Sequence, residues 1–196
     1  MITAAELSRS IYGAWLLARF DARGVGFFEN TAEAFWRSFW AAGVVLPGYG
    51  LLLLFRSTGS TTGVSAPTAF VVHGITYVMI WIAFPFAMFY LARLFDREQW
   101  YCRYIVAYNW AVVLQVTLLL LVSAIAVSGI VPGPAGAALV RIAQLAIMIY
   151  QGFIAHVALQ ATLPGAAGIV LLDFVLGLLI YSWSEKLLKL EFVAAG

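Results

Sequence analysis

The stretch YIVAYNWAVVLQVTLLLLVSAIAV, residues 104–127, decides the fold because it is long and apolar enough to cross a lipid bilayer. A transmembrane helix needs roughly 20 consecutive apolar residues. Comparable runs, edged by aromatic residues or arginine, occupy residues 35–55, 68–91, 137–161 and 166–183. The chain of 196 residues is 64% hydrophobic and 10% charged, and its mean hydropathy is +0.97. We therefore predict an all-α integral membrane protein, a bundle of five transmembrane helices.

An amphipathic helix is predicted to precede the bundle within residues 1–30 and to lie in the membrane interface. Apolar side chains recur at helical spacing at Ala4, Leu7, Ile11 and Trp15. Arg9 and Ser10 fall elsewhere on the helical wheel. Asn30 stands three residues before Glu33, which predicts a capping box at the start of the first span. The transmembrane domain then covers residues 31–183, and residues 184–196 form a short tail.

Basic residues are distributed unequally between the two sides of the predicted bundle. Seven belong to the N-terminal side, namely Arg9, Arg19, Arg23, Arg37, Arg93, Arg97 and Arg103. Four belong to the opposite side, namely Arg56, Arg141, Lys186 and Lys189. Since Lys and Arg concentrate on the cytoplasmic side of membrane proteins, we expect a cytoplasmic N-terminus and an external C-terminus. The richness in Arg and Ala, together with short loops, suits a bacterial inner membrane.

Asp173 is the acidic residue that lies well inside a predicted span. A carboxylate at membrane depth is costly and needs a polar partner or water. His156 stands eight residues before Pro164 and Asp173 nine residues after it. At 1.5 Å per residue, an antiparallel pair of helices would place both roughly 12–14 Å from the turn. We expect Asp173 to face the fourth span near His156, either as a proton relay or polar pocket, or as an interhelical hydrogen bond that fixes helix register.

Further polar side chains extend this candidate cluster. Gln144 and Gln151 are seven residues apart and share a face of the fourth span, and Arg141 stands one turn before Gln144. Asn109 adds an amide to the third span. Such a stripe can line a polar path, or it can pack inward and bond to neighbouring backbone. Both interpretations are open at the level of the sequence.

Motifs for enzyme chemistry are absent from the sequence. It contains no GxSxG, no HExxH and no Walker-type phosphate loop. Cys102 is the single cysteine, and no His, Glu and Asp cluster has metal-ligand spacing. The net charge of +2 is too small to suggest nucleic-acid binding. We therefore expect no catalytic residues, no metal site, no cofactor and no nucleic-acid partner.

The layout resembles the bacterial side of the Yip1-like family. The likeness is carried by YLARLFDREQWYCRYIVAYNWA, residues 90–111, where a charged turn leads into an xAYxxA-like third helix. The ending PGAAGIVLLDFVLGLLI, residues 164–180, also fits as a short last span. The DLYGP-type motif of the eukaryotic members is missing. The resemblance implies five spans with a cytoplasmic N-terminus, and it does not imply an activity.

Two functions follow as hypotheses. The first is a non-enzymatic inner-membrane scaffold or accessory protein whose partners are the lipid bilayer and other membrane proteins or further copies of the chain. The second is a small transporter or channel subunit that uses the intramembrane polar residues. Copurification with a stoichiometric partner would favour the first, and flux in liposomes would favour the second.

Overall fold

Five long helices dominate the structure, a computed structural model that describes residues 2–57 and 65–194. The helices that are long and apolar enough to cross a membrane are Ala32–Phe55, Ala66–Leu94, Glu98–Val127, Gly133–Ala158 and Leu163–Leu188. The described residues contain no strand. The prediction of an all-helical chain with five candidate membrane spans is therefore confirmed.

The elements follow one another as α1 (Ala4–Ala18), η1 (Ala22–Phe27), α2 (Ala32–Ser38), α3 (Trp40–Ser57), α4 (Ala66–Leu94), η2 (Glu98–Trp100), α5 (Tyr101–Val127), α6 (Gly133–Ala158) and α7 (Leu163–Ala194). The predicted spans differ from these bounds by a few residues, and two differences change the layout. The first span is divided at Phe39 into α2 and α3. The last helix continues through most of the predicted tail, and Ser184 is buried within it.

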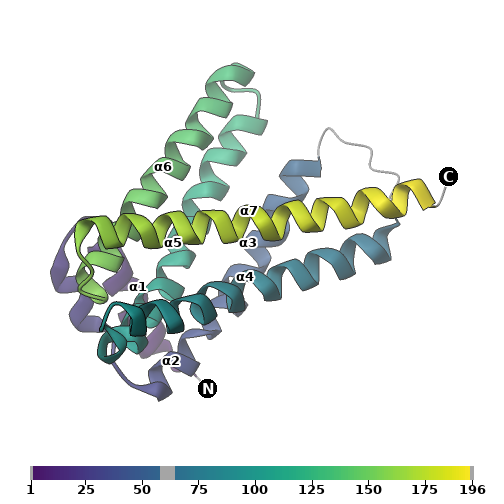
Figure 1. Cartoon of the computed structure of the whole chain (residues 1–196). Coiled ribbons are helices and arrows are strands. Elements are labelled where there is room, and N and C mark those ends of the chain that lie inside the picture. The colour runs from purple at the N-terminus through teal and green to yellow at the C-terminus, as the bar shows by residue number, and fades with distance from the viewer. Residues whose placement is uncertain (1, 58–64, 195–196) are drawn as a thin grey trace.

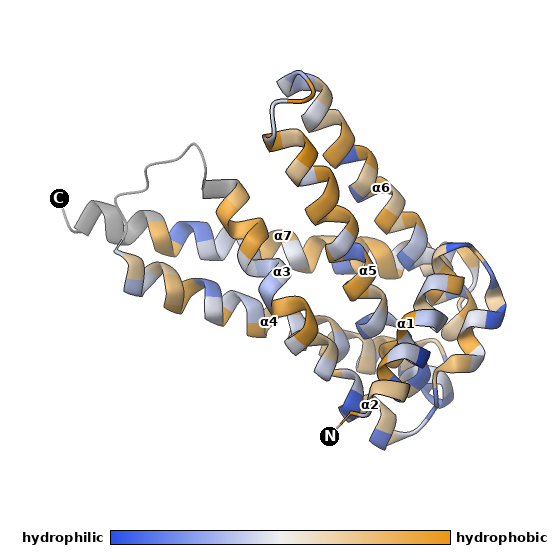
Figure 2. Ribbon diagram, turned by 180° about the vertical axis from the view of Figure 1, so that it is seen from behind, coloured by the Kyte–Doolittle hydropathy of each residue, from blue (hydrophilic) through white to orange (hydrophobic). Residues whose placement is uncertain are grey.

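The spans form two pairs that diverge from a common end (Figure 1). α5 packs against α6 over its length, and α4 packs against α7. α3 packs on α5, whereas α6 also contacts α7 near the turn between them. The distal part of the α5–α6 hairpin consequently points away from the α4–α7 pair. Figure 2 shows hydrophobic residues along the spans and many hydrophilic residues around α1 and α2.

Hydrogen bonds between loops close the common end, which we call the charged end. Arg97 of the α4–α5 turn donates to the Gln160 carbonyl oxygen of the α6–α7 turn at 3.2 Å. Arg103 donates to the Ala158 carbonyl oxygen at 3.1 and 2.9 Å. These bonds satisfy carbonyl groups at and just beyond the end of α6, which lack partners within the helix. The seven basic residues of the N-terminal side belong to segments that gather here, whereas the side chains of Arg56 and Lys189 lie outside the described ones.

α1 packs on α5 through a face that differs from the predicted apolar stripe. Ser10, placed on the polar side of the wheel, is only 5% exposed, whereas Trp15 is 51% exposed. The buried face also carries Ala14 and Leu17, which are fully buried in the core. On the side toward η1 the backbones approach closely, since a Cβ at Gly24 would lie 2.6 Å from the Gly13 carbonyl oxygen. The absence of side chains at Gly13 and Gly24 therefore lets η1 lie directly against α1.

Ion pairs tie α1, α2 and the segment between them together. Arg37 Nε lies 2.8 Å from Glu6, and its Nη2 lies 3.4 Å from Glu29. Arg37 also contacts Glu33 one turn earlier on α2. Arg9 lies 2.5 Å from Glu29, and the bond from Arg9 is the main reason that the pKa of Glu29 is lowered. These side chains remain partly exposed to solvent.

The predicted capping box of Asn30 and Glu33 is wrong, because α2 begins at Ala32 with Thr31 as its N-cap. Thr31 is the N-cap of α2, and its side chain accepts a hydrogen bond from the Ala34 N–H at 3.1 Å. Asn30 instead bonds to η2 and to the first turn of α5: its Nδ2 donates to the Gln99 carbonyl oxygen at 2.6 Å, and its Oδ1 accepts from the Arg103 N–H at 3.0 Å. The first turn of a helix has N–H groups without partners in the helix, and Asn30 satisfies one of them from a distant part of the chain.

Candidate functional site

A polar network joins three helices around Asp173 of α7. The hydroxyl of Tyr108 on α5 donates to Asp173 Oδ1 at 2.8 Å. The amide of Gln151 on α6 donates to Asp173 Oδ2 at 3.0 Å, and its nitrogen lies 3.5 Å from Gln115 Oε1 on α5. Asp173 thus receives a donor on each oxygen, which is the arrangement that a carboxylate at membrane depth requires.

His156 is not the partner of Asp173, although their similar distances from the Pro164 turn predicted that they would meet. Its ring Nδ1 lies 2.8 Å from the Ala161 carbonyl oxygen, in the turn that follows α6, and its side chain is exposed. Gln151 takes the predicted place. The two residues are five positions apart, which rotates them by about 140° around an α-helix. Equal depth in a hairpin therefore does not place two side chains on facing surfaces.

Asn109 is fully buried but belongs to a separate contact. Its Nδ2 donates to Ser38 Oγ at 2.8 Å, and Ser38 Oγ donates to the Phe35 carbonyl oxygen at 2.7 Å. This bond joins α5 to the last turn of α2. Asn109 therefore fixes the position of the first span against α5 and does not extend the network around Asp173.

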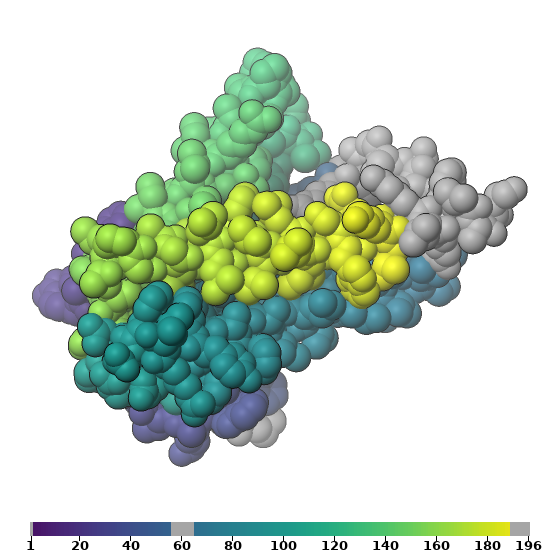
Figure 3. All heavy atoms as spheres, in the orientation of Figure 1, coloured from purple at the N-terminus to yellow at the C-terminus, as the bar shows by residue number. Residues whose placement is uncertain are grey.

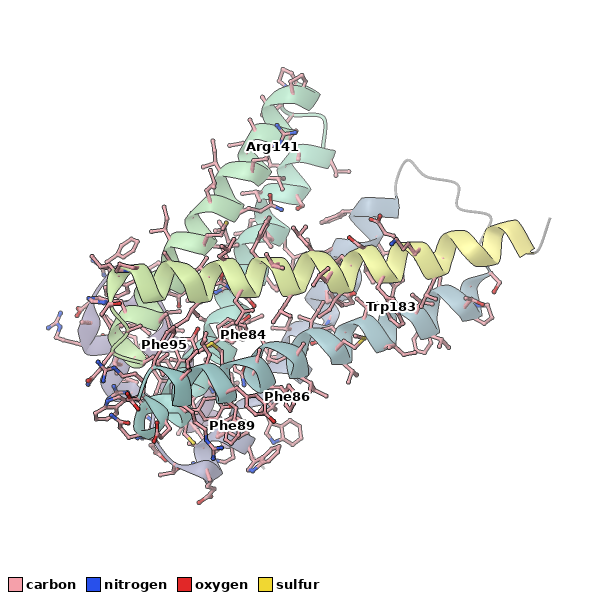
Figure 4. The ribbon with its side chains drawn as sticks, in the orientation of Figure 1. Phe84, Phe86, Phe89, Phe95, Arg141 and Trp183 are labelled. Carbon is pink, nitrogen blue, oxygen red and sulfur yellow. The ribbon has the colours of Figure 1, made fainter. Side chains whose placement is uncertain are left out.

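Arg141 and Gln144 lie outside the network because they are exposed on the distal part of α6. Figure 4 shows Arg141 far along the α5–α6 hairpin from the charged end. Gln151 is the residue of the predicted stripe that donates a hydrogen bond to the Asp173 carboxylate. The structure adds Tyr108 and Gln115 to the expected cluster, and Gln115 bonds to Gln151 rather than to Asn109. The separation of Tyr108 and Gln115 by seven residues on α5 is the signal that could have shown them to share a face.

Cavities lie on both sides of the network. One, of about 150 Å³, lies between α3, α4, α5 and α7 and is lined by Tyr108 together with Tyr49, Tyr77, Trp81 and Tyr181. Another, of about 390 Å³, is lined by Gln115, Tyr150 and apolar residues of α1, α5 and α6. The bonds from Tyr108 through Asp173 and Gln151 to Gln115 therefore run from one cavity to the other.

The chemistry available to this site is proton exchange and hydrogen bonding. Among residues 2–57 and 65–194, no group of three or more His, Cys, Asp or Glu side chains could hold a metal ion. Tyr108 and Gln151 are suited to orient a carboxylate or to bind a small polar molecule. Comparison of the chain with protein-family models, with curated proteins and with solved structures gave no match.

Proposed function

We propose that this chain is a non-enzymatic scaffold or accessory protein of the membrane that binds lipids or other membrane proteins within the bilayer. The observation that carries the proposal is the divergence of the α5–α6 hairpin from the α4–α7 pair. Figure 3 shows the distal hairpin standing clear of α7. α3 packs on α5 at one side of the opening between them, whereas the side between α6 and α7 offers a surface to another component of the membrane.

The side chains along the distal hairpin suit such binding. Leu121 on α5 and Ile142 and Leu145 on α6 are each at least 60% exposed. Isolated apolar residues of this kind are ordinary on a lipid-facing helix. Arg141 and Gln144 are unusual on such a surface, because ionisable and amide groups within spans usually face protein or water. A surface that combines both kinds of residue favours a specific occupant over bulk lipid.

Site-directed photocrosslinking in membranes tests this proposal. A benzoylphenylalanine at Leu145 should form discrete adducts with lipid or with another protein. The same residue at Ile154, which is fully buried, is the matched control. If position 145 formed no more adducts than position 154, the proposal would be refuted.

A second function, that of a small transporter or channel subunit, is favoured by the chain of bonds through Asp173 between two cavities. In this case Asp173→Asn should abolish flux in liposomes and leave the fold intact. If the carboxylate serves only to hold the helices together, Asp173→Asn should keep function, whereas Asp173→Leu should destabilise the protein. Flux that is unchanged in Asp173→Asn would exclude the transport function.

We also propose a bacterial inner membrane as the location, with the N-terminus in the cytoplasm. The support is the gathering of seven basic residues of the sequence in the segments of one end. The layout of five candidate spans is compatible with the resemblance to the Yip1-like family. Further copies of the chain are among the proposed partners.

A further inference from the structure

A polar stripe on α6 faces the opening between α6 and α7, which we call the wedge. Arg141, Gln144, Met148 and Gln151 succeed one another at intervals of three, four and three residues, so they lie on one side of the helix. Gln151 donates to Asp173, which shows that this side faces α7. Farther along, the helices diverge and leave Arg141 and Gln144 exposed (Figures 1 and 4). Within the described chain, no ion pair neutralises the Arg141 guanidinium.

An apolar groove lies beside this stripe, toward the charged end, and shares Met148 with it. It has a volume of about 500 Å³ and lies between α6 and α7. Small and apolar side chains form most of its walls, among them Gly152, Ala167 and Val170, and His156 lines it as well. Arg141 and Gly152 are eleven residues apart, which corresponds to roughly 16 Å along the helix axis. Arg141 and Gln144 thus lie beyond the groove, on the side of α6 that Met148 shares with it.

A polar, cationic region followed by an apolar groove matches a phospholipid, which has a polar headgroup followed by apolar acyl chains. An arginine in a span is costly unless it reaches the interface or a counter-charge. A guanidinium binds phosphate oxygens in a bidentate manner. At the groove α6 and α7 are in contact, since a Cβ at Gly152 would lie 3.6 Å from Val170. A flexible acyl chain can follow it there, whereas a helix about 10–12 Å across could not enter.

We propose that the wedge binds an anionic phospholipid, with Arg141 and Gln144 donating hydrogen bonds to its phosphate and an acyl chain lying in the groove. The headgroup lies toward the tip of the α5–α6 hairpin, away from the charged end. This inference rests on the proposed function, because it names the occupant of the surface that the diverging hairpin leaves open.

Native mass spectrometry of the full chain tests the headgroup. Phosphatidylglycerol and phosphatidylcholine with the same acyl chains are added in equal amounts to the delipidated protein in detergent. The protein should retain phosphatidylglycerol preferentially. Arg141→Gln should reduce that preference about five- to tenfold, because one cation near an anionic headgroup contributes roughly 1 kcal/mol and a charge-assisted bond adds to it. Arg93→Gln removes an equally exposed charge at the other end of the bundle and should leave the preference unchanged.

A bulky substitution in the apolar groove tests whether an acyl chain lies there. Ala167 is exposed in the groove, so Ala167→Phe should lower retention of both lipids without removing the charge. Glycerol phosphate, the water-soluble headgroup alone, should neither bind nor raise the melting temperature. Arg141→Lys keeps the charge but loses the bidentate geometry. Its preference for phosphatidylglycerol should therefore lie between those of the wild type and Arg141→Gln. This conservative variant keeps the test valid if Arg141→Gln misfolds.

Several results would overturn the inference. Equal retention of the two lipids by the wild type would do so, as would equal effects of Arg141→Gln and Arg93→Gln. A benzoylphenylalanine at Gln144 that labelled a protein and no lipid would assign the wedge to a partner helix, and the proposed function would survive. If neither Gln144 nor Leu145 formed adducts above the buried control, the inference and the proposed function would both fail.

Discussion

Removing the Tyr108 hydroxyl is the most direct perturbation of the network around Asp173. In Tyr108→Phe, the ring remains, and its stacking on Phe84, with ring centroids 4.4 Å apart, is retained. The hydrogen bond of 2.8 Å to Asp173 Oδ1 is lost. Asp173 then keeps only the bond from Gln151 at 3.0 Å. The change therefore isolates one interhelical bond between α5 and α7.

The expected cost follows from the number of bonds lost. Intramembrane hydrogen bonds contribute about 0.6 kcal/mol on average and about 1.7 kcal/mol at most. Tyr108→Phe should therefore lower the free energy of unfolding by about 0.6–1.7 kcal/mol. Asp173→Leu removes both bonds to the carboxylate and should cost about 2–3 kcal/mol. Combined with Tyr108→Phe it should cost little more, since the shared bond can be lost only once.

Unfolding of the purified protein in bicelles by added SDS measures these values. Tyr90→Phe is the matched control, because Tyr90 is 58% exposed and should change the free energy of unfolding by less than about 0.5 kcal/mol. Additive costs of Tyr108→Phe and Asp173→Leu, or a Tyr108→Phe cost equal to that of Tyr90→Phe, would show that the bond contributes nothing to the fold.

Three further outcomes are expected. Gly24→Ala should cost about 1–3 kcal/mol and expose α1 to protease, since its Cβ would lie 2.6 Å from the Gly13 carbonyl oxygen, whereas Gly26→Ala meets nothing within 4 Å and should be neutral. The Arg9 guanidinium lowers the pKa of Glu29 below 4.5. The stabilisation from Glu29 is therefore present above that pH and is lost as the pH falls through the lowered pKa. The rate of amide exchange in α1 should rise over this range in the wild type but not in Glu29→Gln. Reporter fusions at Asp96 and Gly129 should read cytoplasmic and external, and the reverse pattern would invert the topology.

The apolar runs alone determined that the chain forms five long helices. Their lengths and aromatic edges follow from the bilayer thickness and need no tertiary information. The sequence also showed that Asp173 requires a polar partner, because the cost of an isolated carboxylate depends only on its depth in the span. The identity of that partner did not follow. His156 has the right depth, but it lies on another side of α6 than Gln151.

Tertiary structure decided how the helices meet, because packing depends on backbone shape and rotation rather than on hydropathy. Gly13 and Gly24 let η1 approach α1 closely, and Ser10 is buried although the helical wheel places it on the polar side. Asn30 leaves the cap of α2 to Thr31, because contact with η2 and the first turn of α5 offers it two bonds. The divergence of α6 from α7 could likewise not be predicted from the sequence, because it depends on how several helices pack together and not on any single residue. It separates the stripe into a paired residue, Gln151, and an exposed pair, Arg141 and Gln144, and so creates the wedge.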